Sequence, residues 1–537
     1  MTLKIAALLV AVALTACSKS PDPSTTSQSG IRPPAAPPVA TAPAPATSED
    51  AGIAWRKGDV DAAFVAAKAE GKPVFLYWGA TWCPPCNQVK ATIFNRQDFI
   101  ERSRHFVPVY IDGDAPNAQK EGSRFKVSGY PTMVLFTPDG TEITRLPGEV
   151  DAEQYMRVLA MGMNNARPVK ATLDAALAAD SSAKLTPEDW RMLAYYSWVT
   201  DEQQLTPRKG LAATLARLAK ACPAEQTETA TRLELQALAA AAEDKAARRS
   251  PDPAATTRLI ALLGDAKRAR ENFDLLAYYA GNIAALVEPA PSPARSKLVA
   301  AWNTALDRFI ADPAIAVDDR LVAVNGKIEL AKLATPKGPL PEPLLATVRA
   351  EAGRADRETT DIYARQSAIS GAAEVLAEAG LLDESDALLT RELARSHSPY
   401  YFMLGLAANA KKRGDKAGAL AWAEKAYDAA KGPATRLQWG VSYMRTLIAS
   451  APDDTARIER VAGQIIGELE PVPETFYERN RRALERMGKE LTAWNKDKRH
   501  DTSVQRIRRE MTAVCEKLPA ADPARATCDG ALVPAKA

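Results

Sequence analysis

The feature that most constrains the fold is a change of sequence pattern near residue 166. Before it, short runs rich in β-forming residues alternate with stretches of helical periodicity. After it, apolar residues recur three or four positions apart and strand-like alternation is nearly absent. The 537 residues also exceed the roughly 250–300 at which a single core stops growing. We therefore predict an α/β domain followed by a large all-α region, residues 166–537, of roughly a dozen helices or more.

Residues 1–17 have the pattern of an export signal. A lysine precedes an uncharged apolar run that is shorter than the ~20 residues of a membrane-spanning helix. The run ends in Leu-Thr-Ala-Cys17, which resembles the bacterial lipobox, whose cysteine is lipidated and becomes the mature N-terminus; the alternative is an ordinary secretory signal with a chance cysteine. We expect the lipid on Cys17 to be the only anchor, on the periplasmic side of the cell envelope, and the serine after it implies the outer membrane. Residues 18–51, rich in Pro, Ala, Ser and Thr, are predicted to be a disordered spacer.

A pair of cysteines stands between a predicted strand and a predicted helix. The strand covers residues 73–78, and a helical pattern follows over residues 87–94. A cysteine at a helix N-terminus faces unpaired backbone N–H groups and the positive end of the helix dipole, and both favour the thiolate that attacks a disulfide. Cys86 lies one turn after Cys83, so that the two sulfurs can form a small disulfide. The spacing therefore predicts a redox-active dithiol.

The order of strand, Trp-Cys-Pro-Pro-Cys and helix resembles the thioredoxin superfamily. The other segments that match are a lead-in helix over residues 59–70, strands over 106–112 and 130–137, a turn at Asp139-Gly140 into 142–146, and a last helix over 152–161. The resemblance covers residues 52–165 and is nearest to the C-terminal periplasmic domain of bacterial transmembrane thiol reductases. It implies an α/β thioredoxin fold and thiol–disulfide exchange with no cofactor beyond the Cys83–Cys86 pair.

The resemblance also implies a role for each residue of the motif. Cys83 is expected to be the nucleophile that forms a mixed disulfide with a client, and Cys86 to attack that bond and release the reduced client. The Gly-Tyr-Pro-Thr run that ends at Thr132 resembles the family's cis-proline loop. Trp82 is expected to flank the site, although simple packing would also explain it. The residues expected to contact the client are Trp82, Pro84, Pro85, Tyr130 and Pro131.

Two positions depart from thioredoxin itself. Tyr77 stands where thioredoxin has a buried aspartate, and Pro108 replaces the lysine partner of that aspartate. A water, Tyr77 or a carboxylate from elsewhere could therefore take the proton of Cys86. The intervening Pro84-Pro85 offers no histidine to stabilise the reactive thiolate, and stabilising the reduced form is what makes an oxidant. This favours a reductase over an oxidase and leaves an isomerase open.

A lone pair of cysteines could also be half of a zinc site or a haem attachment site. A zinc site needs two more ligands at a suitable spacing, and the three histidines, His105, His397 and His500, are far apart in the sequence. Asn87 follows the second cysteine, where c-type haem attachment requires histidine. We therefore predict no metal site.

Part of the helical region has an internal repeat. Gly380 and Gly414 each stand between two helical stretches, and their spacing of 34 residues is the tetratricopeptide period. We predict tetratricopeptide-like repeats over about residues 365–470, with a degenerate third copy over about 436–470; generic antiparallel helical hairpins explain the pattern equally well. Such arrays bind peptides on a concave surface, so client or partner docking is expected. The alternative is that the region only spaces or dimerises.

The remaining cysteines and charges carry weaker predictions. Cys515 and Cys528 are expected to form a structural disulfide, worth ~3 kcal/mol for so short a loop. Cys222 is expected to be a buried apolar residue, with an intermolecular bond or a second redox centre as alternatives. The net charge is only +3, and acidic residues interleave with the arginines at 479–482. We predict a solvated helix face there and no nucleic-acid partner.

Together these patterns predict an envelope-tethered thiol–disulfide oxidoreductase. We expect it to reduce disulfides of client proteins and to receive electrons from an upstream membrane thiol reductase. The first alternative is a disulfide isomerase whose helical region grips clients. The second is a non-enzymatic scaffold that binds through its helical repeats, against which the second cysteine argues, because a docking module needs no second thiol.

Overall fold

The computed structural model describes residues 52–127, 129–148, 150–164, 167–178, 185–202, 205–244, 250–336 and 338–533. The predicted signal peptide, the lipidation site Cys17 and the predicted spacer lie outside these residues. Residues 49–537 form one compact unit. Among the helices that are described, none is both long enough and apolar enough to cross a lipid bilayer.

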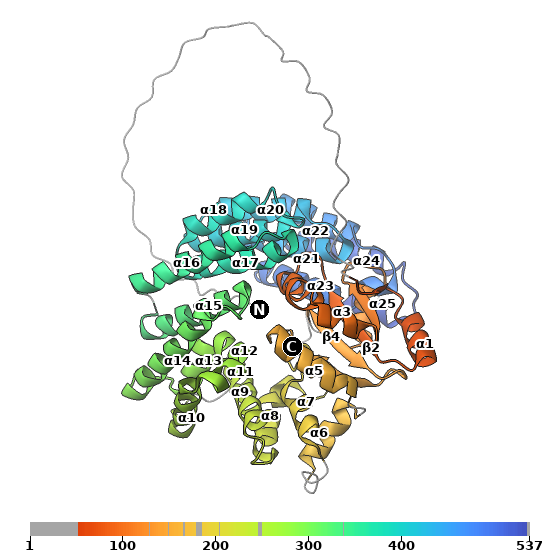
Figure 1. Cartoon of the computed structure of the whole chain (residues 1–537). Coiled ribbons are helices and arrows are strands. Elements are labelled where there is room, and N and C mark those ends of the chain that lie inside the picture. Colours follow the sequence, from red (N-terminus) through yellow and green to blue (C-terminus); the bar gives the residue numbers. More distant parts are fainter. Residues whose placement is uncertain are drawn as a thin grey trace, which may run out of the picture. The chain divides into compact units, whose positions relative to one another are not determined.

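A five-stranded mixed sheet forms the centre of the N-terminal α/β domain (Figure 1). Its strand order is β1-β3-β2-β4-β5, with β1, β3 and β2 parallel and β4 antiparallel to both of its neighbours. The strands are β1 (Arg56–Lys57), β2 (Val74–Gly79), β3 (Val107–Asp112), β4 (Thr132–Phe136) and β5 (Glu142–Leu146). The sequence pattern predicted β2 to β5 closely but not β1, because a two-residue strand is too short to show alternation.

Strand β2 is buried along its whole length, which explains why its sequence is continuously apolar. Phe75 and Tyr77 lie in one core, which they share with helix α5 (Ala152–Asn164). The alternate side chains of the strand lie in a second core, shared with helix α1 (Val60–Glu70). The two other helices that flank the sheet are α3 (Gln97–Ser103) and α4 (Ala118–Arg124). The sheet is thus covered on both faces, as the buried parallel strands at its centre require.

The helices next to the cysteines follow ordinary capping rules. The Asp59 side chain accepts a hydrogen bond from an N–H of the first turn of α1, and Gly71 ends that helix with a φ of 64°. Helix α2 spans Pro84–Val89 and continues as a π-helical turn, Lys90–Phe94. The helix begins directly after Cys83, as the expected position of that cysteine at a helix N-terminus requires, and a proline suits the first helical turn.

The rest of the described chain is helical and runs in an arc that starts beside β5 and returns to the α/β domain (Figure 1). Its first ten helices are α6 (Val169–Leu177), α7 (Pro187–Ala194), α8 (Leu211–Ala221), α9 (Thr227–Glu243), α10 (Pro253–Gly264), α11 (Ala266–Glu271), α12 (Phe273–Tyr278), α13 (Ala280–Val287), α14 (Pro293–Ala311) and α15 (Val317–Ala334). The others are α16 (Glu342–Glu358), α17 (Ile362–Glu378), α18 (Leu382–Glu392), α19 (Pro399–Arg413), α20 (Lys416–Ala429), α21 (Pro433–Ser450), α22 (Thr455–Gly467), α23 (Glu478–Trp494), α24 (Asp501–Cys515) and α25 (Pro523–Gly530).

Glycines close the two hairpins of the predicted repeat. Gly380 joins α17 to α18 with a φ of 83°, and Gly414 joins α19 to α20 with a φ of 80°. Both angles lie in the left-handed region that glycine adopts without strain. The helix–glycine–helix pairs are therefore present, while their likeness to tetratricopeptide repeats stays a prediction.

The cysteines of the helical region are buried. Cys515 and Cys528 form a disulfide, with an S–S distance of 1.97 Å, that joins α24 to α25. Cys222 forms no disulfide within the described part of the chain, and burial raises the pKa of its thiol to about 11. A buried thiol with a raised pKa is unreactive, which fits a packing role and disfavours a second redox centre.

Candidate active site

The two cysteines of the motif lie at the junction of β2 and α2. Cys83 is the N-cap residue of α2, and its Sγ accepts a hydrogen bond from the backbone N–H of Cys86 at 3.2 Å. The two sulfurs form a disulfide, with an S–S distance of 2.11 Å and Cα atoms 5.2 Å apart. When the disulfide is reduced, the same N–H group and the helix N-terminus stabilise a thiolate at Cys83. This position makes Cys83 the better nucleophile of the pair.

A buried amide holds the turn that carries Cys83. The side chain of Asn87 is fully buried, and its Nδ2 donates to the backbone oxygens of Thr81 at 2.9 Å and of Cys83 at 3.0 Å. These bonds tie the residues before the helix to its second turn. Asn87 was used in the sequence analysis only to exclude haem attachment, so that its structural role was missed.

The predicted cis-proline loop lies beside the cysteines. The Tyr130–Pro131 peptide bond is cis, and Thr132 Oγ1 closes the turn by donating to the Gly129 oxygen at 2.7 Å. The ring of Tyr130 meets the ring of Trp82 edge-on, with centroids 6.3 Å apart. Two segments about fifty residues apart in sequence therefore meet at the dithiol, in the order in which the motifs occur.

Comparison with known proteins agrees with this geometry. Residues 60–162 match the family model of the thioredoxin-like domain. This segment is a thioredoxin-like domain. A thiol:disulfide interchange protein DsbD of Pseudomonas fluorescens is 32% identical over 103 residues, 18% of this chain and 18% of that protein. DsbD of Yersinia pestis is 33% identical over 99 residues, 18% of this chain and 17% of that protein. The chain thus matches less than a fifth of the length of these relatives, and the similarity concerns the thioredoxin-like domain alone.

The proton path of Cys86 has no aspartate on β2. Tyr77 occupies that position, buried, and stacks on Tyr110 of β3 with ring centroids 5.1 Å apart. The helical region brings one carboxylate to α2, because Asp319 of α15 accepts a hydrogen bond from Gln88 at 2.8 Å. Burial, together with the neighbouring Asp318, raises the pKa of Asp319 to about 7. A carboxyl with that pKa can exchange protons near neutral pH, although the hydrogen bond of Asp319 is with Gln88 and not with a cysteine.

The dithiol is covered by the helical region. Cys86 is fully buried, and Cys83 and Trp82 are only 3% and 8% exposed. All three belong to the hydrophobic core that α19 to α25 build. Trp439 of α21 packs against the Trp82 ring at 4.7 Å between centroids, and Tyr401 of α19 stacks on it at 5.9 Å. The redox centre is therefore at a domain interface.

Polar contacts cross the same interface. Trp82 Nε1 donates to Thr435 Oγ1 at 2.7 Å, and that hydroxyl donates to Asp114 Oδ2 at 2.5 Å. Gln366 Nε2 donates to the Trp82 backbone oxygen at 3.4 Å. The His397 ring donates from Nε2 to the backbone oxygen of Thr81 at 2.9 Å, since a carbonyl oxygen can only accept. Most polar groups next to the dithiol thus have partners in the helical region.

Charged groups at the interface have perturbed pKa values. Burial raises the pKa of Asp114 to about 6, against the lowering effect of its hydrogen bonds from Thr435. Arg479 of α23 lies over the rings of Tyr130 and Trp82, 4.6 and 5.7 Å from their centroids, and burial lowers its pKa. The expectation that the arginines at 479–482 form a solvated helix face is therefore wrong for Arg479. The interleaved acidic residues hid a side chain that packs on the aromatic rings beside the dithiol.

The predicted client-contact residues differ in exposure. Trp82 is buried, Pro84, Tyr130 and Pro131 are half-buried, and Pro85 is exposed. The residues of the helical region that contact Trp82 and its neighbours could not be predicted from the sequence. These contacts join positions about 280 to 400 apart, and no local pattern signals them. These residues are Gln366, His397, Tyr401, Thr435, Trp439 and Arg479.

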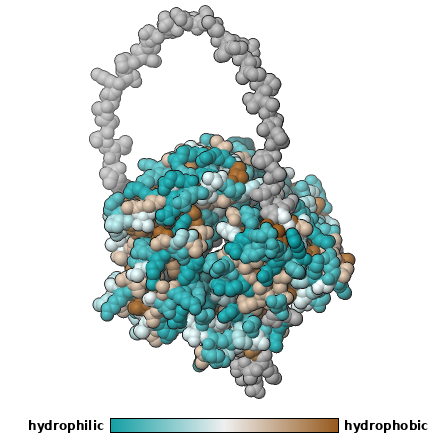
Figure 2. Space-filling model, in the orientation of Figure 1, coloured by the Kyte–Doolittle hydropathy of each residue, from teal (hydrophilic) through white to brown (hydrophobic). Residues whose placement is uncertain are grey.

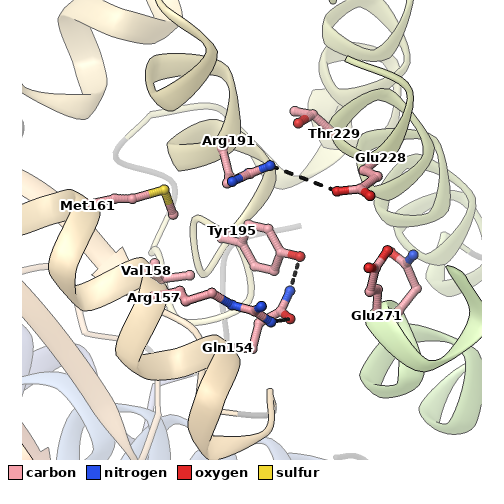
Figure 3. Close-up of a pocket in the computed structure, with 10 residues that line it drawn as sticks. Gln154, Arg157, Val158, Met161, Arg191, Tyr195, Glu228, Thr229 and Glu271 are labelled. Atoms are coloured by element: carbon pink, nitrogen blue, oxygen red, sulfur yellow. Dashed lines mark hydrogen bonds and ion pairs between the residues drawn. The ribbon is translucent and has the colours of Figure 1, made fainter. Parts of the chain in front are cut away.

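A separate pocket of about 110 Å³ lies between α5, α7, α9 and the end of α11 (Figure 3). Charged side chains of both signs line it, and Arg191 faces Glu228 across it at 3.9 Å. Tyr195 and Gln154 form a hydrogen bond at its base. None of the residues of the dithiol site lines this pocket, so it is not the site of thiol chemistry.

Proposed function

We propose that this chain is a thiol–disulfide oxidoreductase that uses the Cys83–Cys86 dithiol. The observation that carries the proposal is the position of Cys83 Sγ, at the N-terminus of α2, bonded to the Cys86 N–H and beside the cis-proline loop. The similarity of this domain to thiol:disulfide interchange proteins supports it. A scaffold that only docks would need neither the second thiol nor this geometry.

The proposed reaction is a two-step exchange. The Cys83 thiolate attacks one sulfur of a client disulfide, so that the client S–S bond breaks and its second sulfur leaves as a thiolate. The Cys86 thiolate then attacks Cys83 Sγ, which restores the Cys83–Cys86 disulfide and releases the first client sulfur as a thiolate. Two electrons have moved from the dithiol to the client, and the two departing client thiolates are protonated from solvent. An external dithiol must reduce the enzyme again before the next turnover.

The proposed direction is reduction. The dithiol loop contains two prolines and no cation, so that its thiolate is stabilised mainly by the helix N-terminus and a strong oxidant is not expected. The lipobox-like sequence at Cys17 favours an enzyme anchored in the cell envelope, and the serine that follows Cys17 favours the outer membrane. In that oxidising compartment a reductase needs a membrane thiol reductase as electron donor. Clients are proteins with disulfides; an isomerase acting on the same clients is the second candidate.

The reduction potential of the Cys83–Cys86 pair tests the direction. The full chain is equilibrated with glutathione buffers, thiols are alkylated, and the peptide that contains both cysteines is quantified by mass spectrometry, so that Cys515–Cys528 is not counted. A potential near ~−270 mV supports a reductase, whereas one near ~−120 to −180 mV contradicts it and favours an oxidase or isomerase. A Cys86→Ser variant should accumulate mixed disulfides with clients, and a Cys222→Ser variant should not; no trapped species would contradict the exchange mechanism itself.

A further inference from the structure

We infer that the helical region is a movable cover that keeps the dithiol from protein partners until it opens. The cover is defined by six residues of the helical region, on α17, α19, α21 and α23 and in the segment before α19. They are Gln366, His397, Tyr401, Thr435, Trp439 and Arg479. The inference rests on the proposed function and adds its regulation.

Access to the attacked sulfur is the first argument. Thiol–disulfide exchange requires the incoming sulfur to reach Cys83 Sγ along the line of the S–S bond. Cys83 is 3% exposed, and Trp82 beside it is buried under Tyr401 and Trp439. A sulfur held in a folded partner brings its neighbouring backbone with it, and the core that Cys83 shares with α19 to α25 leaves no free surface for that backbone. In the closed arrangement, therefore, a protein disulfide or dithiol cannot reach Cys83.

The second argument is the way in which α21 is held. Its N-cap residue, Gly432, has no side chain, so that the first N–H groups of the helix lack a cap of their own. Asp114 of the thioredoxin-like domain supplies one, since its Oδ1 accepts from the Thr435 N–H at 2.8 Å. A Cβ on Gly432 would lie 2.3 Å from that carboxyl group, which explains why a glycine stands there. The cover is thus attached to the dithiol domain through a helix end that water could cap instead.

The chemistry of the contact is the third argument, because it suits a contact that opens. The bonds from Trp82 through Thr435 to Asp114, and from His397 to Thr81, join groups that water can also satisfy. Arg479 is held over two aromatic rings at the expense of its hydration. Each polar group that leaves the interface regains water, which offsets part of the apolar burial that is lost. A permanent core built only of apolar side chains would have no such compensation.

Two threonines on the same helix provide the test. Thr435→Val removes the hydroxyl that accepts a hydrogen bond from Trp82 Nε1 and donates one to Asp114 Oδ2. Both groups therefore lose this hydrogen-bond partner. Thr446→Val removes a hydroxyl that donates only to the Ser442 backbone oxygen, at 3.0 Å, and is the matched control. The rate of reduction of Cys83–Cys86 in the full chain is measured with reduced thioredoxin as a protein dithiol and with dithiothreitol as a small one. The alkylated peptide is quantified by mass spectrometry.

We expect Thr435→Val to raise the rate with reduced thioredoxin about tenfold, because the loss of one buried hydrogen-bonded group favours the open form by roughly that factor. Thr446→Val should leave the rate unchanged. Equal rates for the parent and a folded Thr435→Val would overturn the inference. Should Thr435→Val fail to fold by circular dichroism, His397→Ala, which loses the bond to Thr81, takes its place with the same two outcomes.

A client assay separates this inference from the proposed function. The reduction of insulin disulfides by the full chain, with dithiothreitol as electron source, is measured for the parent and for each variant. Faster reduction of Cys83–Cys86 in Thr435→Val, with no client reduced by any variant, would uphold the cover and reject the proposed reductase. Client reduction by the parent at the same rate as by Thr435→Val would uphold the reductase and reject the cover.

Discussion

At the scale of single residues, the dithiol turn is held by a side chain that takes no part in exchange. Asn87 is fully buried one position after Cys86 and donates to the oxygens of Thr81 and Cys83. Cys83 Sγ can accept the hydrogen bond from the Cys86 N–H only while this turn keeps its shape. The amide is therefore a positioning group for the reactive sulfur.

Replacing Asn87 by alanine should destabilise the thioredoxin-like domain. Two hydrogen bonds to the backbone oxygens of the dithiol turn would be lost, at about 0.5–1.5 kcal/mol each and about 1–3 kcal/mol together. Urea denaturation of the full chain measures the loss. Gln97→Ala is the control, because the Gln97 amide bonds Glu101 at the exposed surface, 2.9 Å away, and its loss should change the free energy of unfolding by less than about 0.5 kcal/mol. An equal effect of the two substitutions would show that Asn87 is not structurally special.

Residues of the site divide into those that local sequence predicts and those that it cannot. Cys83, Cys86 and Pro131 stand in short motifs whose neighbours specify strand, helix start and loop. Thr435 and Arg479 meet Trp82 from more than 350 positions away, and each has an unremarkable helical sequence around it. Only the packing of the two domains brings them together, and no periodicity in the sequence predicts that packing.

At the scale of elements, periodicity and turn chemistry predicted most boundaries. Strands β2 to β5 and helices α1 and α5 lie close to their predicted ranges, because runs of β-forming residues, helical periodicity and the Asp139-Gly140 turn mark them. The two-residue β1 and the π-helical turn Lys90–Phe94 have no such signal. In the helical region the glycines at 380 and 414 marked two hairpins, whereas the order of helices around the arc follows from tertiary contacts alone.

The α24–α25 pair carries a prediction at this scale. The Cys515–Cys528 disulfide closes a loop with a sequence separation of 13, for which chain entropy predicts a contribution of roughly 3 kcal/mol. Cys515→Ala with Cys528→Ala should therefore speed hydrogen exchange of the α25 amides by roughly 100-fold, measured by mass spectrometry of deuterated peptides. Cys222→Ala, which removes a buried thiol that is free in the described structure, should leave exchange in α25 unchanged. Unchanged exchange in the double variant would mean that packing alone holds α25.

At the scale of the whole molecule, the two domains meet through buried polar groups as well as through an apolar core. On the face shown in Figure 2 hydrophilic residues predominate and hydrophobic ones form small separate groups. The aromatic residues around the dithiol belong to, or pack against, the buried core that α19 to α25 build. Burial raises the pKa of Asp114 to about 6 and the pKa values of Asp319 and Glu478 to about 7. Asp114 bonds Thr435 and Asp319 bonds Gln88, both across the domain contact.

These raised pKa values make the contact depend on pH in a defined direction. A carboxyl whose pKa is higher in the folded than in the unfolded protein binds its proton more tightly when folded. Its contribution to stability is then greatest below its unfolded pKa of ~4 and falls as the pH rises through its folded pKa. For Asp114 this window is about pH 4 to 7. The charged and titratable groups that act on Asp114 are Asp112, Tyr130, Tyr400 and Arg479.

Asp114→Asn should remove this part of the pH dependence. The uncharged amide keeps an oxygen that accepts from the Thr435 N–H but cannot ionise, so that the variant loses less stability than the parent between pH 5 and pH 8, by roughly 1.4 kcal/mol. Urea denaturation at the two pH values measures the difference. Asp139→Asn is the control, because hydrogen bonds in the exposed β4–β5 turn lower the pKa of Asp139, and its contribution is lost only as the pH falls below ~4. If the free energy of unfolding of Asp114→Asn changes between pH 5 and pH 8 by as much as that of the parent, then Asp114 is ionised throughout this range. The domain contact then does not weaken through this group as the pH rises.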